Sequence, residues 1–138
     1  TFAGVKGGLG ALSLAKGAKK SLETAIDLDP TALAGSAYAS LGTLYHKVPG
    51  WPIGFGNKGK AQVMLEKALE ISPNGIDANY FYGEFLFDEG DYELARQHLE
   101  LARQAPGRAG RELADVSRQS EITQLLGRVD AKQSKKKG

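Results

Sequence analysis

The sequence predicts an all-α fold in which helical hairpins stack into a solenoid, and three observations support this prediction. The first is a pattern of Ala, Leu and Ala at Ala61, Leu65 and Ala68, which places small and large apolar residues on one face of a helix. The second is that the pattern recurs, and its copies are Ala18-Leu22-Ala25 and Ala95-Leu99-Ala102. The third is the spacing of 34 residues between Ala61 and Ala95, a period typical of arrays of helical hairpins.

The second repeat is predicted to carry an insertion. The spacing from Ala18 to Ala61 is 43 residues, which is longer than the period of 34. Most of the excess falls in residues 46–60, between the two helices of that repeat. Residues 48–59 contain two prolines and four glycines, which excludes a regular helix.

The order of the elements follows from the breakers between them. We expect helices over 14–28, 32–47, 58–71, 76–89, 92–104 and 111–129. Residues 1–15 should form only a frayed helix, because each interior glycine costs a helix about 1 kcal/mol relative to Ala. The repeats are then about 1–32, 35–75 and 76–106, with a closing helix over 111–129. Together they form one domain, 1–130, followed by a disordered basic tail, 131–138.

Local chemistry supports two of these helix boundaries. Asn57 stands where it can cap the helix that begins at Lys58. Gly90 and Asp91 stand between two apolar helical stretches and predict a tight turn. Gly35 and Gly42 in the preceding helix would let a neighbouring helix approach closely.

These motifs resemble the tetratricopeptide repeat (TPR). The first helix of the second repeat places Tyr38, Leu41, Gly42 and Tyr45 at the offsets typical of TPR proteins, and Gly90–Ala95 resembles the turn between the two TPR helices. The resemblance implies a TPR-like helical-hairpin solenoid of three repeats, with a concave face that binds protein segments. No constellation of catalytic residues accompanies these motifs, so we do not expect an enzyme.

Three further stretches resemble a bacterial TPR group related to the T-component of the tripartite ATP-independent periplasmic (TRAP) transporters. They are VPGWPIGFGNKGKA, SPNGIDANYFYGEFL and APGRAGRELADVSR. This resemblance implies a bacterial periplasmic or cell-envelope setting, reached with a leader that is not visible at Thr1. Without it, we expect a cytoplasmic protein. It also implies an alternative function, a small-ligand-binding accessory subunit of a periplasmic transporter.

Composition excludes several classes of function. Among 138 residues there is no Cys, so disulfide and thiolate chemistry are excluded. The net charge is +2, and residues 128–138 supply the basic excess, so the charge does not indicate a specific nucleic-acid-binding domain. No apolar run approaches the length of about 20 residues that a membrane span needs.

Candidate catalytic and metal-binding motifs are weak. Gly54–Lys60 matches a phosphate-binding loop, but Ala61 replaces its Ser or Thr, so we interpret these glycines as turn residues. His46 and His98 lie in different repeats and are expected at the surface, so no metal is expected. Glu84 and Asp88, one helical turn apart, could form an acid–base pair, but a solvated helix face explains them better. No cofactor is expected.

The candidate binding residues lie on the side of each front helix that carries no packing position. In a TPR solenoid that side faces the concave groove, and its members here are Thr43, His46, Lys47, Tyr80, Glu84, Phe87 and Asp88. Two alternatives stay open for this set: its side chains bind a partner, or they are buried. Trp51 and Phe55 of the insertion would form a lip beside the groove. Two alternatives stay open for the insertion: it binds a partner, or it only packs against the stack.

We therefore expect a non-catalytic adaptor that binds a peptide segment or a partner protein in its concave groove. A small organic ligand is the alternative. Neither a specific nucleic acid nor a membrane span is expected, and a homo-oligomer is left open. Near the C-terminus, Arg111, Asp115 and Arg118 are expected to form exposed ion pairs within one helix.

Overall fold

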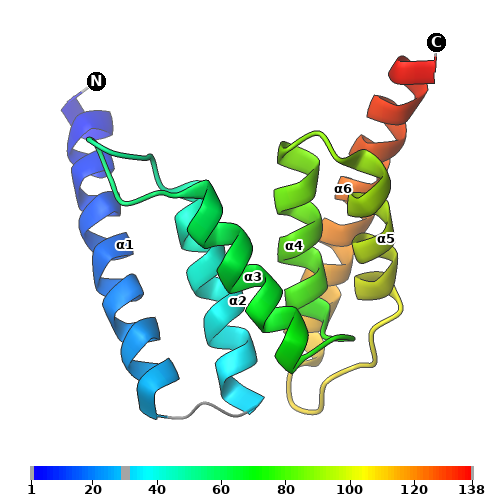
Figure 1. The fold of residues 1–138 in the computed structure, drawn as a ribbon, viewed down its shortest axis with the longest axis horizontal. Helices are drawn as coiled ribbons and strands as arrows, with labels where there is room; N and C mark the ends of the chain where they lie inside the picture. The colour runs from blue at the N-terminus through cyan, green and yellow to red at the C-terminus, as the bar shows by residue number, and fades with distance from the viewer. Residues whose placement is uncertain (1, 29–31, 138) are drawn as a thin grey trace. The chain divides into compact units, whose positions relative to one another are not determined.

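The computed structural model describes residues 2–28 and 32–137, which form six α-helices and no β-strand (Figure 1). The helices are α1 (Phe2–Leu28), α2 (Ala32–Lys47), α3 (Lys58–Ile71), α4 (Ile76–Asp88), α5 (Tyr92–Arg103) and α6 (Glu112–Lys137). They divide into two compact units, Thr1–Ile71 and Ser72–Gly138, and each unit is described by itself. The helices pack in antiparallel pairs, so the predicted all-α fold of helical hairpins is confirmed.

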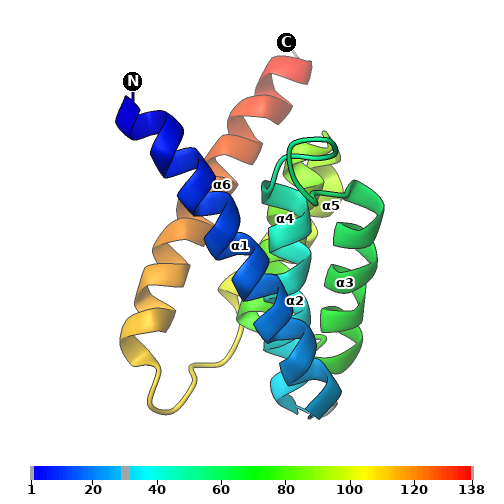
Figure 2. The ribbon, with the colours of Figure 1, turned by 90° about the vertical axis from the view of Figure 1, so that its left-hand side faces the viewer.

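In the first unit, α2 packs against both α1 and α3 (Figure 2). The α2–α3 hairpin is held by the predicted small and large residues, because Ala61, Leu65 and Ala68 are all completely buried. Gly42 of α2 faces Leu65 so closely that an added Cβ would lie 2.7 Å from the Leu65 Cγ. A glycine is therefore required at position 42 for the two helices to approach at this distance.

In the second unit, α4 and α5 form a hairpin of the same design. Ala95, Leu99 and Ala102 are completely buried, and a Cβ at Gly83 would lie 2.9 Å from the Leu99 Cγ. Gly90 turns the chain with a positive φ of 84°, and the Asp91 carboxylate accepts a hydrogen bond from the Leu94 backbone. The third helix of the unit, α6, adds its own buried residues, Ile122, Leu125 and Val129.

The first repeat differs from the prediction, because residues 2–28 form one continuous helix rather than a hairpin. Ala18 and Ala25 are exposed, and the half-buried residues of α1 within 10–28 are instead Leu12, Ala15, Lys19, Leu22, Glu23 and Ile26. The glycines of residues 1–15 lower helix propensity, but no proline or turn motif interrupts the backbone before Leu28. The pattern at 18, 22 and 25 therefore does not mark a repeat core.

The C-terminal segment also differs from the prediction. Residues 131–137 continue α6, whereas disorder was expected from 131 onward; residue 138 lies outside the described residues. The Gln133 side chain accepts a hydrogen bond of 3.0 Å from Arg96 Nε, and Arg96 also pairs with Asp130. These contacts with α5 stabilise the last turns of α6, which the lysine-rich composition alone would not predict.

Candidate functional site

The insertion between α2 and α3 is a closed loop held by its own backbone. The Gly56 N–H donates to the Pro49 carbonyl at 2.9 Å, and the Asn57 N–H donates to the Tyr45 carbonyl at 3.0 Å. At the apex, the Ile53 N–H donates to the Gly50 carbonyl at 3.1 Å. A Cβ at Gly56 would lie 1.8 Å from the Val48 carbonyl oxygen, so this glycine allows the loop to close.

The base of the insertion is joined firmly to α3. The Asn57 Oδ1 accepts a hydrogen bond of 2.9 Å from the Lys60 N–H, which confirms Asn57 as the N-cap of that helix. Capping satisfies one of the backbone donors that the first helical turn leaves without a partner. The loop therefore has a defined shape from Tyr45 to Lys60.

The two predicted lip residues have different environments. Trp51, at the apex, is 89% exposed, and its neighbour Ile53 is 70% exposed. Phe55 is half-buried and packs edge-on against Tyr45, with 5.7 Å between the ring centroids. Phe55 therefore packs against the protein, as the packing alternative predicted. The Trp51 side chain is exposed and is accessible to a partner.

The predicted binding residues Tyr80 and Phe87 of α4 are covered by α6. Each is only 6% exposed. The Arg118 guanidinium lies 4.8 Å from the centre of the Tyr80 ring, and that of Arg128 lies 4.7 Å from the centre of the Phe87 ring. The Tyr80 hydroxyl donates to Glu121 at 3.3 Å, and burial raises the pKa of this hydroxyl. Of the two alternatives for these rings, binding or burial, the structure shows burial, because side chains of α6 cover them.

The other predicted groove residues remain candidates. Thr43 is half-buried, and its hydroxyl donates to the Ala39 carbonyl at 2.8 Å. His46 and Glu84 are half-buried, whereas Lys47 and Asp88 are exposed. The residues of α2 belong to the first unit and those of α4 to the second. Their role in binding a partner stays a prediction.

An ion-pair network centred on Asp77 was not predicted. Asp77, at the start of α4, accepts from Arg108 Nη1 at 3.2 Å and from Arg118 Nε at 3.0 Å. Arg108 also donates from its backbone and side chain to Asp115, at 2.8 and 2.7 Å, and these bonds lower the pKa of the Asp115 carboxyl. Asp115 therefore pairs with Arg108, and Arg118 pairs with Asp77, whereas ion pairs among Arg111, Asp115 and Arg118 within one helix were predicted. The network joins α4, the α5–α6 connection and α6.

A polar pair between the buried Asn79 and the half-buried His98 was also not predicted. Asn79 is completely buried, and its amide donates to the carbonyls of Pro73 and Gly75 at 2.9 and 3.0 Å. Its oxygen lies 2.9 Å from His98 Nδ1, so this ring nitrogen carries the hydrogen. Burial lowers the pKa of His98. His98 is thus half-buried and links α4 to α5, whereas a histidine fully at the surface was expected.

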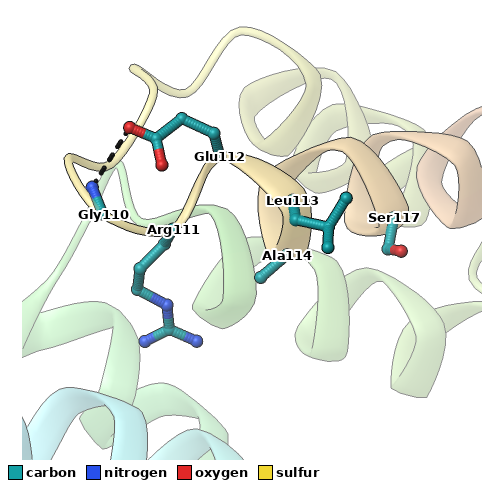
Figure 3. Close-up of a pocket in the computed structure, with 6 residues that line it drawn as sticks. All are labelled: Gly110, Arg111, Glu112, Leu113, Ala114 and Ser117. Carbon is teal, nitrogen blue, oxygen red and sulfur yellow. Dashed lines mark hydrogen bonds between the residues drawn. The ribbon is translucent and has the colours of Figure 1, made fainter.

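Two surface depressions contrast in how they are built. One, of about 530 Å³, is lined by a single stretch at the start of α6, where Glu112 accepts a hydrogen bond from the Gly110 backbone (Figure 3). The other, of about 400 Å³, is lined from three helices by Glu23, Ile26, Asp27, Tyr38, Leu41 and Met64. Only the second brings polar groups together from several elements, which is the usual construction of a ligand site.

The described residues contain neither a candidate metal site nor a candidate membrane-spanning helix. No group of three or more His, Cys, Asp or Glu side chains among them could hold a metal ion. Across residues 2–28 and 32–137, no helix is long and apolar enough to cross a membrane.

Comparison with known proteins gives a match to a family model over part of the chain. Residues 54–114, which include α3, α4 and α5, match the family model described as tetratricopeptide repeat. No curated protein and no solved structure matches the chain. The match gives no support to the resemblance to the TRAP T-component. Residues 54–114 carry a tetratricopeptide repeat, and such a repeat implies a protein-binding scaffold in general.

Proposed function

We propose that this chain is a non-catalytic adaptor that binds a segment of a partner protein, with Trp51 as the anchor. The observation that carries the proposal is the 89% exposure of Trp51 at the apex of a loop whose backbone is hydrogen-bonded at both ends. The loop leads directly into the tetratricopeptide repeat over residues 54–114. An exposed tryptophan on such a loop is typical of a binding residue rather than a packing residue.

The construction of the loop favours binding. Tryptophan is among the residues that contribute most to protein interfaces, where truncation to alanine often costs 2 kcal/mol or more, as an order of magnitude. Phe55 packs on Tyr45 and holds the base of the loop, so Trp51 is presented on a support that is already ordered. Less conformational entropy is then lost when a partner binds.

Thr43, His46 and Lys47, which belong to the same unit as Trp51, are proposed as further polar contacts of the partner. Glu84 and Asp88 belong to the second unit and are proposed as polar contacts of that unit by itself. Tyr80 and Phe87 are left out, because α6 already covers them. No step of this proposal requires catalysis, a cofactor or a metal.

A selection with random peptides tests the proposal. A library of random dodecapeptides is panned on the immobilised full chain, and the affinity of each enriched peptide is measured for wild type, Trp51→Ala and Leu28→Ala. Leu28 is the matched control, since it is 80% exposed and belongs to the same unit. We expect Trp51→Ala to weaken binding by about 1–3 kcal/mol, as anchor truncations do, and Leu28→Ala to leave it unchanged. If no enriched peptide depends on Trp51, the adaptor proposal in this form is wrong.

The second candidate function is the binding of a small organic ligand. It is favoured by the depression of about 400 Å³ in the first unit, where the carboxylates of Glu23 and Asp27 lie with Tyr38. Such a site would suit a cationic ligand, and calorimetry with small amines against wild type and Glu23→Gln would test it.

A bacterial periplasmic or envelope location remains a prediction, which fractionation of cells that express the full gene would test.

A further inference from the structure

The charged residues of the first unit are segregated along its helices. The sequence contains no Asp or Glu from residue 30 to residue 65, and none from residue 1 to residue 22. Lysines lie in both stretches, and no arginine occurs before residue 96. The acidic residues of the unit are Glu23, Asp27, Asp29, Glu66 and Glu70.

The antiparallel packing of α1, α2 and α3 places the last turns of α1 and α3, which carry Asp27, Glu66 and Glu70, away from the insertion. The insertion joins the end of α2 to the start of α3 and lies at the same end of the unit as the start of α1 (Figure 1). A Cβ at Gly54 would lie 3.3 Å from Leu12 Cδ1, so the insertion contacts α1 directly. Lys16, Lys19 and Lys20 follow Leu12 within the next turns of that helix.

Individual contacts place lysines beside the insertion. Lys19 Nζ lies 5.8 Å from the centre of the Phe55 ring, and Lys60 Nζ lies 5.6 Å from the centre of the Tyr45 ring. Lys47, at the end of α2, and Lys58, at the start of α3, are exposed on the two sides of the loop. We call Lys16, Lys19, Lys20, Lys47, Lys58 and Lys60 the basic fringe of the insertion.

Apart from Glu23, the carboxylates of the described helices lie farther along them. Glu23 pairs with Lys19 at 3.1 Å, and Asp27 lines the depression with Tyr38 and Leu41, well down α2 from the insertion. Glu66 and Glu70 belong to the last turns of α3. Lysines of the described helices therefore lie beside the base of the insertion that presents the exposed Trp51 and Ile53.

We infer that the segment recognised by the insertion is acidic: a peptide that presents Asp or Glu side chains around an apolar residue, which contacts Trp51. This inference rests on the proposed function and names the chemistry of the partner. Charge complementarity of this kind speeds association and excludes basic partners. An anionic membrane is the less suitable occupant, because binding to a bilayer scales with buried apolar area and the apex offers only two large apolar side chains.

The peptides selected on the immobilised chain also test this inference. Those that depend on Trp51 should be enriched in Asp and Glu and should contain at least one large apolar residue. The double variant Lys58→Glu/Lys60→Glu should weaken their binding by about tenfold or more at low salt, and the difference should shrink as salt screens exposed charges. The matched control is Lys67→Glu, an exposed lysine farther along α3, which should leave the affinity within about twofold.

The outcomes separate the inference from the proposed function. If Trp51-dependent peptides are neutral or basic, or if the double variant binds them as wild type does, the acidic partner is wrong while the adaptor proposal stands. If no peptide depends on Trp51, both are wrong. Sedimentation with vesicles of phosphatidylcholine and phosphatidylserine tests the membrane alternative. If wild type binds these vesicles, Trp51→Ala abolishes that binding and no peptide depends on Trp51, then the apex binds a membrane surface and the inference is overturned.

Discussion

The hairpins α2–α3 and α4–α5 have the same core and different connections. In each, a glycine of the first helix faces a leucine of the second, Gly42 against Leu65 and Gly83 against Leu99. The α4–α5 connection is a tight turn at Gly90 and Asp91, whereas the α2–α3 connection is a closed loop over residues 48–57. A long connection can thus be added without changing how the helices pack, which makes the loop available for recognition.

The largest expected effect tests whether the two cores are equivalent. Leu65→Ala and Leu99→Ala should each lower the free energy of unfolding by about 2–5 kcal/mol, because each removes a completely buried side chain from the same kind of contact. Chemical denaturation followed by circular dichroism measures both. A loss at Leu65 much smaller than the loss at Leu99 would mean that the insertion loosens the first hairpin.

A smaller effect tests the close approach of the helices. Ala68→Leu and Ala102→Leu should destabilise by about 1–3 kcal/mol through overpacking, since both alanines are completely buried. Ala25→Leu is the matched control, because Ala25 has the same position in the sequence pattern but is exposed on α1. Its effect should stay within about 0.5 kcal/mol. A control as harmful as the two test variants would contradict the assignment of α1 as a single helix without a repeat core.

The next prediction uses a difference between the hairpins in pH dependence. Burial lowers the pKa of His98 in the folded state, so the folded protein binds its proton less readily than the unfolded chain. The stability that neutral His98 contributes is therefore present above the unfolded pKa of about 6.5 and is lost as the pH falls below it. Denaturation between about pH 8 and pH 5 should show this loss for wild type and a flatter profile for His98→Gln. Identical slopes would show that His98 does not titrate with folding.

The smallest expected effect concerns the insertion. Trp51→Ala should change the free energy of unfolding by less than about 0.5 kcal/mol, because the side chain is exposed. Phe55→Ala should cost at least about 1 kcal/mol, because its ring packs edge-on against Tyr45. Calorimetric melting of both variants provides the comparison. A large loss of stability in Trp51→Ala would show that the Trp51 side chain packs against the protein and is not accessible to a partner.

The sequence predicted those features that depend on local periodicity. The positions of Leu65 and Leu99, the N-cap at Asn57 and the turn at Gly90 all follow from spacing and residue type, and the structure confirms them. The continuous helix α1 was not predicted, because glycine lowers helix propensity without enforcing a break.

Features that depend on contacts between distant residues were not predictable in this way. The burial of Tyr80 and Phe87 depends on where α6 lies. In the folded protein, Arg118 and Arg128 of α6 lie over these two rings, and the spacing of residues along the sequence does not reveal these contacts. The same holds for Asn79, whose partners include His98, 19 residues away. Trp51 and Phe55 could not be separated, because alternation along an irregular loop does not determine which side chain packs.

Trp51 is the only tryptophan of the chain, and its position has a spectroscopic consequence. An indole that is 89% exposed in the folded protein emits as it would from the unfolded chain, so tryptophan fluorescence will hardly register the loss of the helical cores. The same emission will shift when an apolar surface covers the ring. Tryptophan fluorescence therefore reports binding at the insertion and changes little on unfolding. The absorbance and fluorescence of the five tyrosines are the better optical signals for the folded state.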